Sequence, residues 1–413
     1  MISSYLFLVF TQCKSLVESP QFDGESVVAE LESKTKEVLV QLDLNTEQEL
    51  IHYLQHHDFS VIRNLLESHP FLYIFYLINS IAEHRVDATT DELGRFRYQD
   101  SVQKQIGVEE NLVLQLIHHA TIKNDVLSRS FRIKNHASYI FLSHDIDSVN
   151  GSFLQDGMWA LKNGRFDILL KLFANVVLQH PGWLNMDLIM DLESEYDFKS
   201  TFYWLVNKGR IDKRQTNADY TISSGEMQKV YRRVEERGFE NGLHKSISSD
   251  DFVTELGKLP SKVSGNRFHY LKFNVPDAYQ NIESSGLKLD ASLGFAEHHG
   301  FRNSYGYPFS PYNFEKNTVH SFVEVPLNIM DGSFQRYKGI PVEKTANTVI
   351  AFLETNKQNC LLSLLWHNTF FSNYKYRGYR NEYIKILQYL RESSFININQ
   401  SGIIREFSWK KKS

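Results

Sequence analysis

The chain has 413 residues, 42% of them hydrophobic and 13% aromatic, and its formal net charge is −4. This composition supports a sizeable folded core, and the slightly acidic balance argues against a nucleic-acid partner. Two cysteines, Cys13 and Cys360, are too few for a disulfide framework, and no stretch approaches the roughly 18 apolar residues of a membrane span. We therefore expect a soluble, cytoplasmic protein without a membrane span, whose oligomeric state the sequence does not indicate.

Residues 1–130 are predicted to form a helical accessory region. Apolar residues recur at helical spacing over several segments, and the polar segment 87–101 between two of them is typical of a loop. The segments with helical spacing are 25–42, 46–69, 71–84 and 107–124. The region contains no motif with a known mechanism.

From residue 131 to 413, short apolar strands alternate with helical segments. The expected strands are 138–143, 199–206, 239–244, 267–273, 287–293, 322–330 and 359–368. The expected helices between them are 187–196, 224–237, 249–259, 276–285, 341–356 and 378–391. This alternation predicts an α/β fold with parallel strands, as a barrel or an open sheet. In a barrel the strand carboxyl ends share one mouth, where active sites gather.

The first of these strands leads into the sequence FLSHDIDSVN. Asp145 and Asp147 would point the same way if the extended conformation persists. Two carboxylates on one side repel each other unless a cation or a shared proton compensates them. A metal site is one interpretation, and a pair of Asx turns leaving the strand is the other.

Other strand ends also carry polar residues. His244 ends the third strand, Arg267 and His269 are spaced to share one face of the fourth, and His367 ends the last. Any one of them alone is typical of a hydrogen-bonded structural residue. A carboxylate with two imidazoles, however, is a common ligand set for catalytic zinc and non-haem iron. Asp145 could then deprotonate an activated water, and His367 could protonate a leaving group.

Seven motifs in order, SHDID, KSTFYWL, NGLHKS, NRFHYLKF, LDASLGFAEHHGFRNS, EVPLNIMDGS and LLWHN, resemble polysaccharide deacetylases of the NodB-homology type. Such proteins are carbohydrate esterases. More narrowly, the sequence is similar to a bacterial branch that carries an N-terminal extension before the deacetylase domain. The segment DELGRFRYQD resembles the end of that extension. The resemblance covers residues 135–400. It implies a distorted (β/α)7-type barrel. It also implies metal-dependent removal of an acetyl group, with N-acetyl expected before O-acetyl, from a saccharide of the cell envelope or its precursor.

The resemblance also implies roles for individual residues. Asp145 would be the general base, oriented by Arg267, and His367 the general acid. Asp147 and His244 would bind a divalent ion, zinc being the first choice. Asp290 falls near the substrate-contacting motif of the family.

Three residues are candidates for contacts with the acetylated saccharide. Besides Asp290, Arg302 could recognise a carboxylate or phosphate, and Trp366 could form a wall of the acetyl pocket. The alternatives are a structural ion network of Asp290, Arg302 and Glu324, and plain packing of Trp366.

The sequence departs from the family pattern at one position. A second histidine is expected four or five residues after His244, where Ser248 and Ser249 stand. Either His269 supplies the third ligand, or the site has lost metal and the protein binds glycan without turnover. A glycosyltransferase holding a metal–nucleotide complex on Asp145 and Asp147 would leave the other histidines unexplained.

Overall fold

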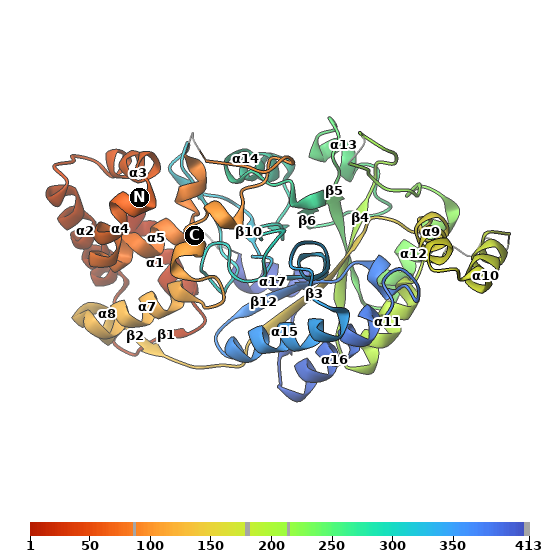
Figure 1. Ribbon diagram of the computed structural model, residues 1–413. Coiled ribbons are helices and arrows are strands. Elements are labelled where there is room, and N and C mark those ends of the chain that lie inside the picture. The colour runs from red at the N-terminus through yellow and green to blue at the C-terminus, as the bar shows by residue number, and fades with distance from the viewer. Residues whose placement is uncertain (86–87, 178–181, 213–214, 409–413) are drawn as a thin grey trace.

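The computed structural model describes residues 1–85, 88–177, 182–212 and 215–408. Helices gather at the N-terminal end of the molecule (Figure 1). They are α1 (Ile2–Gln12), α2 (Gly24–Gln41), α3 (Glu47–His56), α4 (Phe59–Ser68), α5 (Pro70–Ile78), α6 (Gln103–Ile106), α7 (Leu112–Lys123) and α8 (Asp125–Ser130). The short strands β1 (Leu16–Glu18) and β2 (Phe131–Ile133) pair antiparallel beside them.

Helix starts in this region follow from capping residues. Asp23 accepts hydrogen bonds from the first backbone N–H groups of α2, and Thr46 does the same for α3. Asp58 caps α4 in an extended conformation, which breaks the single helix expected over 46–69 into α3 and α4. Every residue from Phe71 to Ile78 of α5 is buried, as its apolar sequence predicts.

A curled parallel sheet forms the rest of the core and confirms the predicted distorted α/β barrel. Its strand order is β10-β7-β6-β5-β4-β3-β12-β11, and β13 (Ile396–Asn397) pairs with the amino end of β3. The other strands are β3 (Tyr139–Ile146), β4 (Ser200–Leu205), β5 (Glu240–Lys245), β6 (Gly265–Phe268), β7 (Leu289–Asp290), β10 (Val323–Glu324), β11 (Ile329–Met330) and β12 (Leu361–Leu365). The single strand expected over 322–330 is in fact two short strands, β10 and β11, at opposite ends of this order.

Helices between and after the strands surround the sheet (Figure 1). They are α11 (Met186–Glu195), α12 (Gly225–Glu236), α13 (Phe252–Leu256), α14 (Val275–Ser285), α15 (Val342–Thr355), α16 (Tyr379–Glu392) and α17 (Gln400–Phe407). A small hairpin of β8 (Tyr312–Asn313) and β9 (Thr318–Val319) lies apart from the sheet. Residues Ile140 to Ile146 of β3 are all buried, as expected for a strand covered on both faces.

Two helices were not expected from the sequence. These are α9 (Ser152–Lys162) and α10 (Phe166–Val177), which form a helical hairpin projecting from the barrel at the end opposite the N-terminal helices (Figure 1).

The N-terminal helices pack directly against the barrel. Tyr5 meets Tyr312 edge to face at 5.7 Å between ring centroids, and Ser15 and Tyr307 share a 2.9 Å hydrogen bond. Both regions contribute to one continuous apolar core. Within the described residues, no helix is both long and apolar enough to cross a bilayer.

Candidate metal centre

Six of the residues singled out in the sequence meet at the carboxyl end of the sheet. They are Asp145, Asp147, His244, Arg267, His269 and His367, which lie in or directly after β3, β5, β6 and β12. Five of them line a cavity of about 60 Å³, and Arg267 lies behind it. The remaining lining residues are Arg95, Tyr270, Leu271, Met330, Gly332, Arg336, Tyr337, Leu365 and Phe370.

Three ligand atoms converge in this cavity. His244 Nε2 and His269 Nδ1 are 3.1 Å apart, and they lie 3.3 and 3.4 Å from Asp147 Oδ1. The other ring nitrogens face carbonyls, since His244 Nδ1 is 2.9 Å from Arg267 O and His269 Nε2 is 2.8 Å from Thr216 O. A carbonyl only accepts, so those nitrogens carry hydrogen and donate it. The two nitrogens nearest Asp147 are therefore free to act as ligands.

The electrostatics of this cluster call for a positive charge at its centre. Two imidazole lone pairs at 3.1 Å repel each other unless a proton or a metal cation lies between them. Asp147 Oδ1 is buried and accepts no hydrogen bond within the described structure. Loss of solvent alone would raise the pKa of Asp147, but His269, His244 and His367 together hold that pKa well below its usual range.

The two histidines differ in protonation. Burial lowers the pKa of His269 to about 4, so this ring is neutral near pH 7. Burial also disfavours a charge on His244, but the carboxylates of Asp145 and Asp147 outweigh it and raise the pKa of His244. A metal cation and the extra proton on His244 would compete for the same place. One carboxylate and two imidazoles fit a divalent ion of the zinc type.

Asp145 is fixed beside this cluster by a buried arginine. Arg267 Nη1 donates to Asp145 Oδ1 at 3.0 Å and to Ser143 Oγ at 2.8 Å. Arg267 Nε donates to Ala291 O at 2.8 Å, and the guanidinium lies over the Tyr203 ring. Asp145 Oδ2 is 3.7 Å from His244 Nε2. Because Arg267 is fully buried and held on several sides, the orientation of the Asp145 carboxylate is set by the core.

His367 faces the cluster and is supported by a residue that was not predicted to lie in the site. Asp331 is fully buried after β11 and accepts hydrogen bonds from His367 N at 2.6 Å and from His367 Nδ1 at 2.7 Å. Burial disfavours the imidazolium, but the charges of Asp331 and Asp147 raise the pKa of His367 to about 9. His367 Nε2 lies 3.7 Å from Asp147 Oδ2. An aspartate directly after a short apolar strand, as in IMDGS, is the signal that could have identified Asp331.

The predicted loop of the N-terminal region also reaches the site. Arg95 donates to the Tyr270 carbonyl at 3.0 Å and to the Tyr337 hydroxyl at 3.1 Å, while its Nε pairs with Asp91 at 2.7 Å. Tyr270 and Leu271, the two residues after His269, both have positive φ angles, of 59° and 50°. Such angles are costly for side chains of this size, so the turn behind His269 needs outside support.

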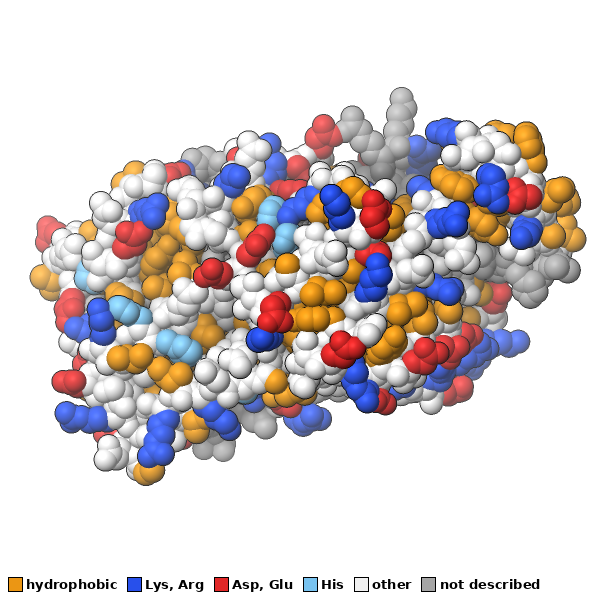
Figure 2. Space-filling model, turned by 60° about the horizontal axis from the view of Figure 1, so that its bottom comes forward, with side chains coloured by type: hydrophobic (Ala, Val, Ile, Leu, Met, Phe, Trp, Pro, Cys, Tyr) orange, Lys and Arg blue, Asp and Glu red, His pale blue; other side chains and the backbone are white. Residues whose placement is uncertain are grey.

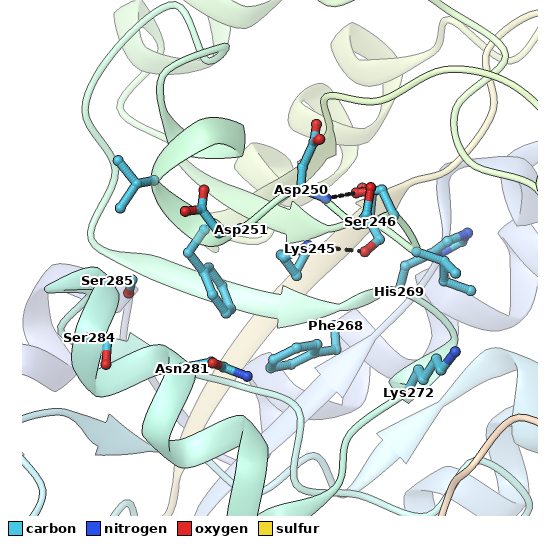
Figure 3. Close-up of a pocket in the computed structure, with 15 residues that line it drawn as sticks. Lys245, Ser246, Asp250, Asp251, Phe268, His269, Lys272, Asn281, Ser284 and Ser285 are labelled. Atoms are coloured by element: carbon cyan, nitrogen blue, oxygen red, sulfur yellow. Dashed lines mark hydrogen bonds between the residues drawn. The ribbon is translucent and has the colours of Figure 1, made fainter.

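The serines in place of the second motif histidine serve another purpose. Ser248 Oγ donates to the buried Glu255 at 3.1 Å and accepts from Asn207 Nδ2 at 3.0 Å. Ser248 and Ser249 line a separate hollow of about 580 Å³, which His269 also borders (Figure 3). His269 is thus the residue that joins this hollow to the metal cluster.

Asp290, Arg302 and Trp366 were expected to contact substrate, and the structure places all three in the core instead. Each is at most 2% exposed, and none lines the cavity. Arg302 forms two hydrogen bonds with Glu83, at 2.6 and 3.0 Å. Asp290 accepts from Asn266 at 2.6 Å, and burial raises its pKa to about 6. Trp366 packs on the Phe370, Tyr379 and Tyr383 rings. The arginine thus pairs across to the N-terminal region rather than with Asp290 or Glu324.

No family model matches this sequence, and no curated protein matches it. Solved structures do resemble its fold. A putative polysaccharide deacetylase from Mycobacterium smegmatis covers 67% of this chain and 96% of its own, at 11% identity and a TM-score of 0.42. A peptidoglycan N-acetylglucosamine deacetylase covers 67% of this chain and 92% of its own, at 10% identity and a TM-score of 0.36. A CE4 family pseudoenzyme from Bacillus anthracis covers 67% of this chain and 70% of its own, at 10% identity and a TM-score of 0.34. These likenesses concern the fold alone.

Proposed function

We propose that this protein is a metal-dependent hydrolase that removes an acetyl group, in the first place N-acetyl, from a cell-envelope polysaccharide or its saccharide precursor. The observation that carries the proposal is the convergence of Asp147 Oδ1, His244 Nε2 and His269 Nδ1, all within 4.8 Å of one another, beside an arginine-held carboxylate. Core packing does not require this arrangement, because it brings two imidazole lone pairs together beside a buried carboxylate oxygen, and they repel each other unless a proton or a metal cation lies between them.

Each side chain has a role in this reaction. The ion would be held by Asp147, His244 and His269, a ligand set that favours zinc. When bound, such an ion acts as a Lewis acid that lowers the pKa of water and polarises a carbonyl. Asp145, oriented by Arg267, accepts the proton of the attacking water. His367, kept protonated by Asp331, gives a proton to the departing amine nitrogen.

The hollows around the site support a saccharide as substrate. The cavity of about 60 Å³ suits a group as small as acetyl. A wider hollow of about 600 Å³ adjoins it and shares Arg95 and Tyr337 with it. Tyr337 is 46% exposed between the two, so its ring is available to stack on a sugar face.

The Asp145→Asn variant tests the assignment of the base. Asparagine keeps the shape of the side chain but cannot accept the proton, so acetate release from N-acetylglucosamine oligomers should fall by about a hundredfold or more. Cobalt binding, followed by visible absorption, should persist because Asp145 is not a ligand. Full activity in this variant would show that Asp145 is not the base.

A catalytically degenerate glycan-binding protein is the second candidate. The observation that favours it is the absence of the second motif histidine, whose place Ser248 and Ser249 take. This candidate requires binding of acetylated oligosaccharides with no acetate release at any metal loading. Isothermal titration with the same oligomers, run beside the acetate assay, separates the two functions.

A further inference from the structure

The helical hairpin of α9 and α10 exposes far more apolar surface than its size requires. Its exposed large apolar residues are Phe153, Leu154, Met158, Leu161, Phe166, Leu170, Phe173 and Val177. Their side chains are between 42% and 72% exposed. So many exposed apolar residues on one short hairpin mark an interaction surface.

The exposed residues follow the helical repeat. On α10, Phe166, Leu170, Phe173 and Val177 are spaced i, i+4, i+7 and i+11, so they form one stripe along the helix. On α9, Leu154 begins a second stripe, which Met158 and Leu161 continue at i+4 and i+7.

A different set of apolar residues holds the hairpin together. Ala160, Ile168 and Leu172 are buried in a cluster of their own, against which Trp159, Leu169 and Tyr374 pack. The outer stripes lie outside this cluster and are largely exposed within the described chain.

The charges around the stripes are mainly positive. Lys162 and Lys171 are exposed, and neither takes part in an ion pair within the described residues. Asp167, the exposed acid of the hairpin, is neutralised by Arg165 at 2.7 Å. Figure 2 shows orange apolar patches at this right-hand end of the molecule, with blue basic side chains among them. The surface thus combines apolar stripes with unpaired lysines.

The hairpin is connected to the barrel beside the active site. It follows β3, and only the four residues from Ser148 to Gly151 separate it from Asp147. Asp219 fixes this connection by accepting from Val149 N at 2.8 Å and Asn150 N at 2.9 Å. Trp183 Nε1 donates to the buried Asp156 of α9 at 3.2 Å.

We propose that the α9–α10 hairpin docks on a membrane surface that contains anionic lipid. The apolar stripes would enter the boundary between headgroups and acyl chains, and Lys162 and Lys171 would meet the lipid phosphates. Aliphatic and phenyl side chains offer no hydrogen bonds to a glycan. Two copies meeting through these stripes would bring lysines of like charge together. At 11 and 12 residues the helices lie on the bilayer rather than span it.

Vesicle sedimentation with the full chain tests this proposal. The wild type should bind vesicles of phosphatidylcholine with phosphatidylglycerol about tenfold more strongly than vesicles of phosphatidylcholine alone. The double variant Leu170→Ser, Phe173→Ser should lose about tenfold or more of that binding. The matched control is Val40→Ser, Val61→Ser, which changes residues 81% and 65% exposed on α2 and α4 and should bind as the wild type does.

Three results would overturn the proposal. One is a wild type that binds neither kind of vesicle, and another is an equal loss of binding in the control variant. The third is a wild-type dimer in light scattering that the Leu170→Ser, Phe173→Ser variant dissociates, because a second copy would then cover the stripes. Unchanged circular dichroism of both double variants shows that these exposed substitutions leave the fold intact.

Discussion

Asp331 determines how His367 can act. Its carboxylate accepts from both the backbone and the side chain of His367, so it fixes the imidazole and favours its protonated form. A general acid must carry its proton when the leaving group departs. With the pKa of His367 raised to about 9, the proton is present at neutral pH and is lost as the pH rises through that value.

The Asp331→Asn variant should therefore change the pH dependence of catalysis. Asparagine removes the charge that favours the imidazolium, so the pKa of His367 should fall and the alkaline limb of kcat/KM should move to lower pH by about one unit or more. The pH profile of acetate release measures this shift. An alkaline limb that stays in place would mean that His367 is not the titrating acid. Glu255→Gln, in the separate serine network, is the matched control and should leave the limb unchanged.

At the scale of elements, the turn after β6 depends on the N-terminal region. His269 stands at the start of this turn, its next two residues have positive φ angles, and Arg95 holds the carbonyl of Tyr270. The Arg95→Ala variant should loosen the turn and weaken cobalt binding by about tenfold. Arg95→Lys should recover only part of the affinity, since an ammonium lacks the planar fork that reaches both Tyr270 and Tyr337.

The neighbouring Arg97 provides the control. It is exposed and, among the residues that the structure describes, forms an ion pair only with nearby Asp100, at 2.5 Å, so Arg97→Ala should leave cobalt affinity unchanged. Equal affinity in Arg95→Ala and the wild type, read from the cobalt absorption bands, would contradict a positioning role for Arg95.

The loop between β7 and β10 is fitted closely to the N-terminal region. Gly300 has a φ of 121°, and a Cβ there would lie 2.3 Å from the Val108 carbonyl oxygen. Gly300→Ala should lower the free energy of unfolding by about 2 to 4 kcal/mol. Gly225→Ala is the control, because Gly225 begins α12 with open space around it. Urea denaturation compares them, and equal stabilities would contradict the close fit.

Helices and strands could be predicted from the sequence where a regular spacing of apolar residues extends over the whole element. The strands β4 and β5 and the helices α11, α12, α15 and α16 begin and end within one residue of their predicted bounds, whereas β3 continues three residues beyond its predicted end. Short elements were harder to predict. Segment 322–330 is one apolar run, but the chain crosses from one end of the sheet to the other between β10 and β11, which no local pattern records. The α9–α10 hairpin was missed because its apolar residues cover two sides of each helix.

At the scale of the whole molecule, the site joins residues from distant parts of the chain. Asp145, Asp147, His244 and His367 could be predicted to lie together, because each lies at the carboxyl end of a recognisable strand. His269 was expected near the start of a strand over 267–273, whereas β6 ends at Phe268, directly before it. Arg95 could not be predicted from a polar loop, since its contacts lie 175 and 242 residues away. The partner of Arg302 could not be predicted for the same reason, because Glu83 lies in the N-terminal region. The boundary at residue 130 stays a prediction.

The measurement that tests the central claim most directly is the metal content of the purified full chain, with His269→Ala and Asp147→Ala beside the wild type. Near-stoichiometric zinc or another divalent ion in the wild type, lost in both variants, is the predicted result. A wild type that holds no metal after incubation with zinc, cobalt or nickel would contradict the metal centre, and with it the hydrolase.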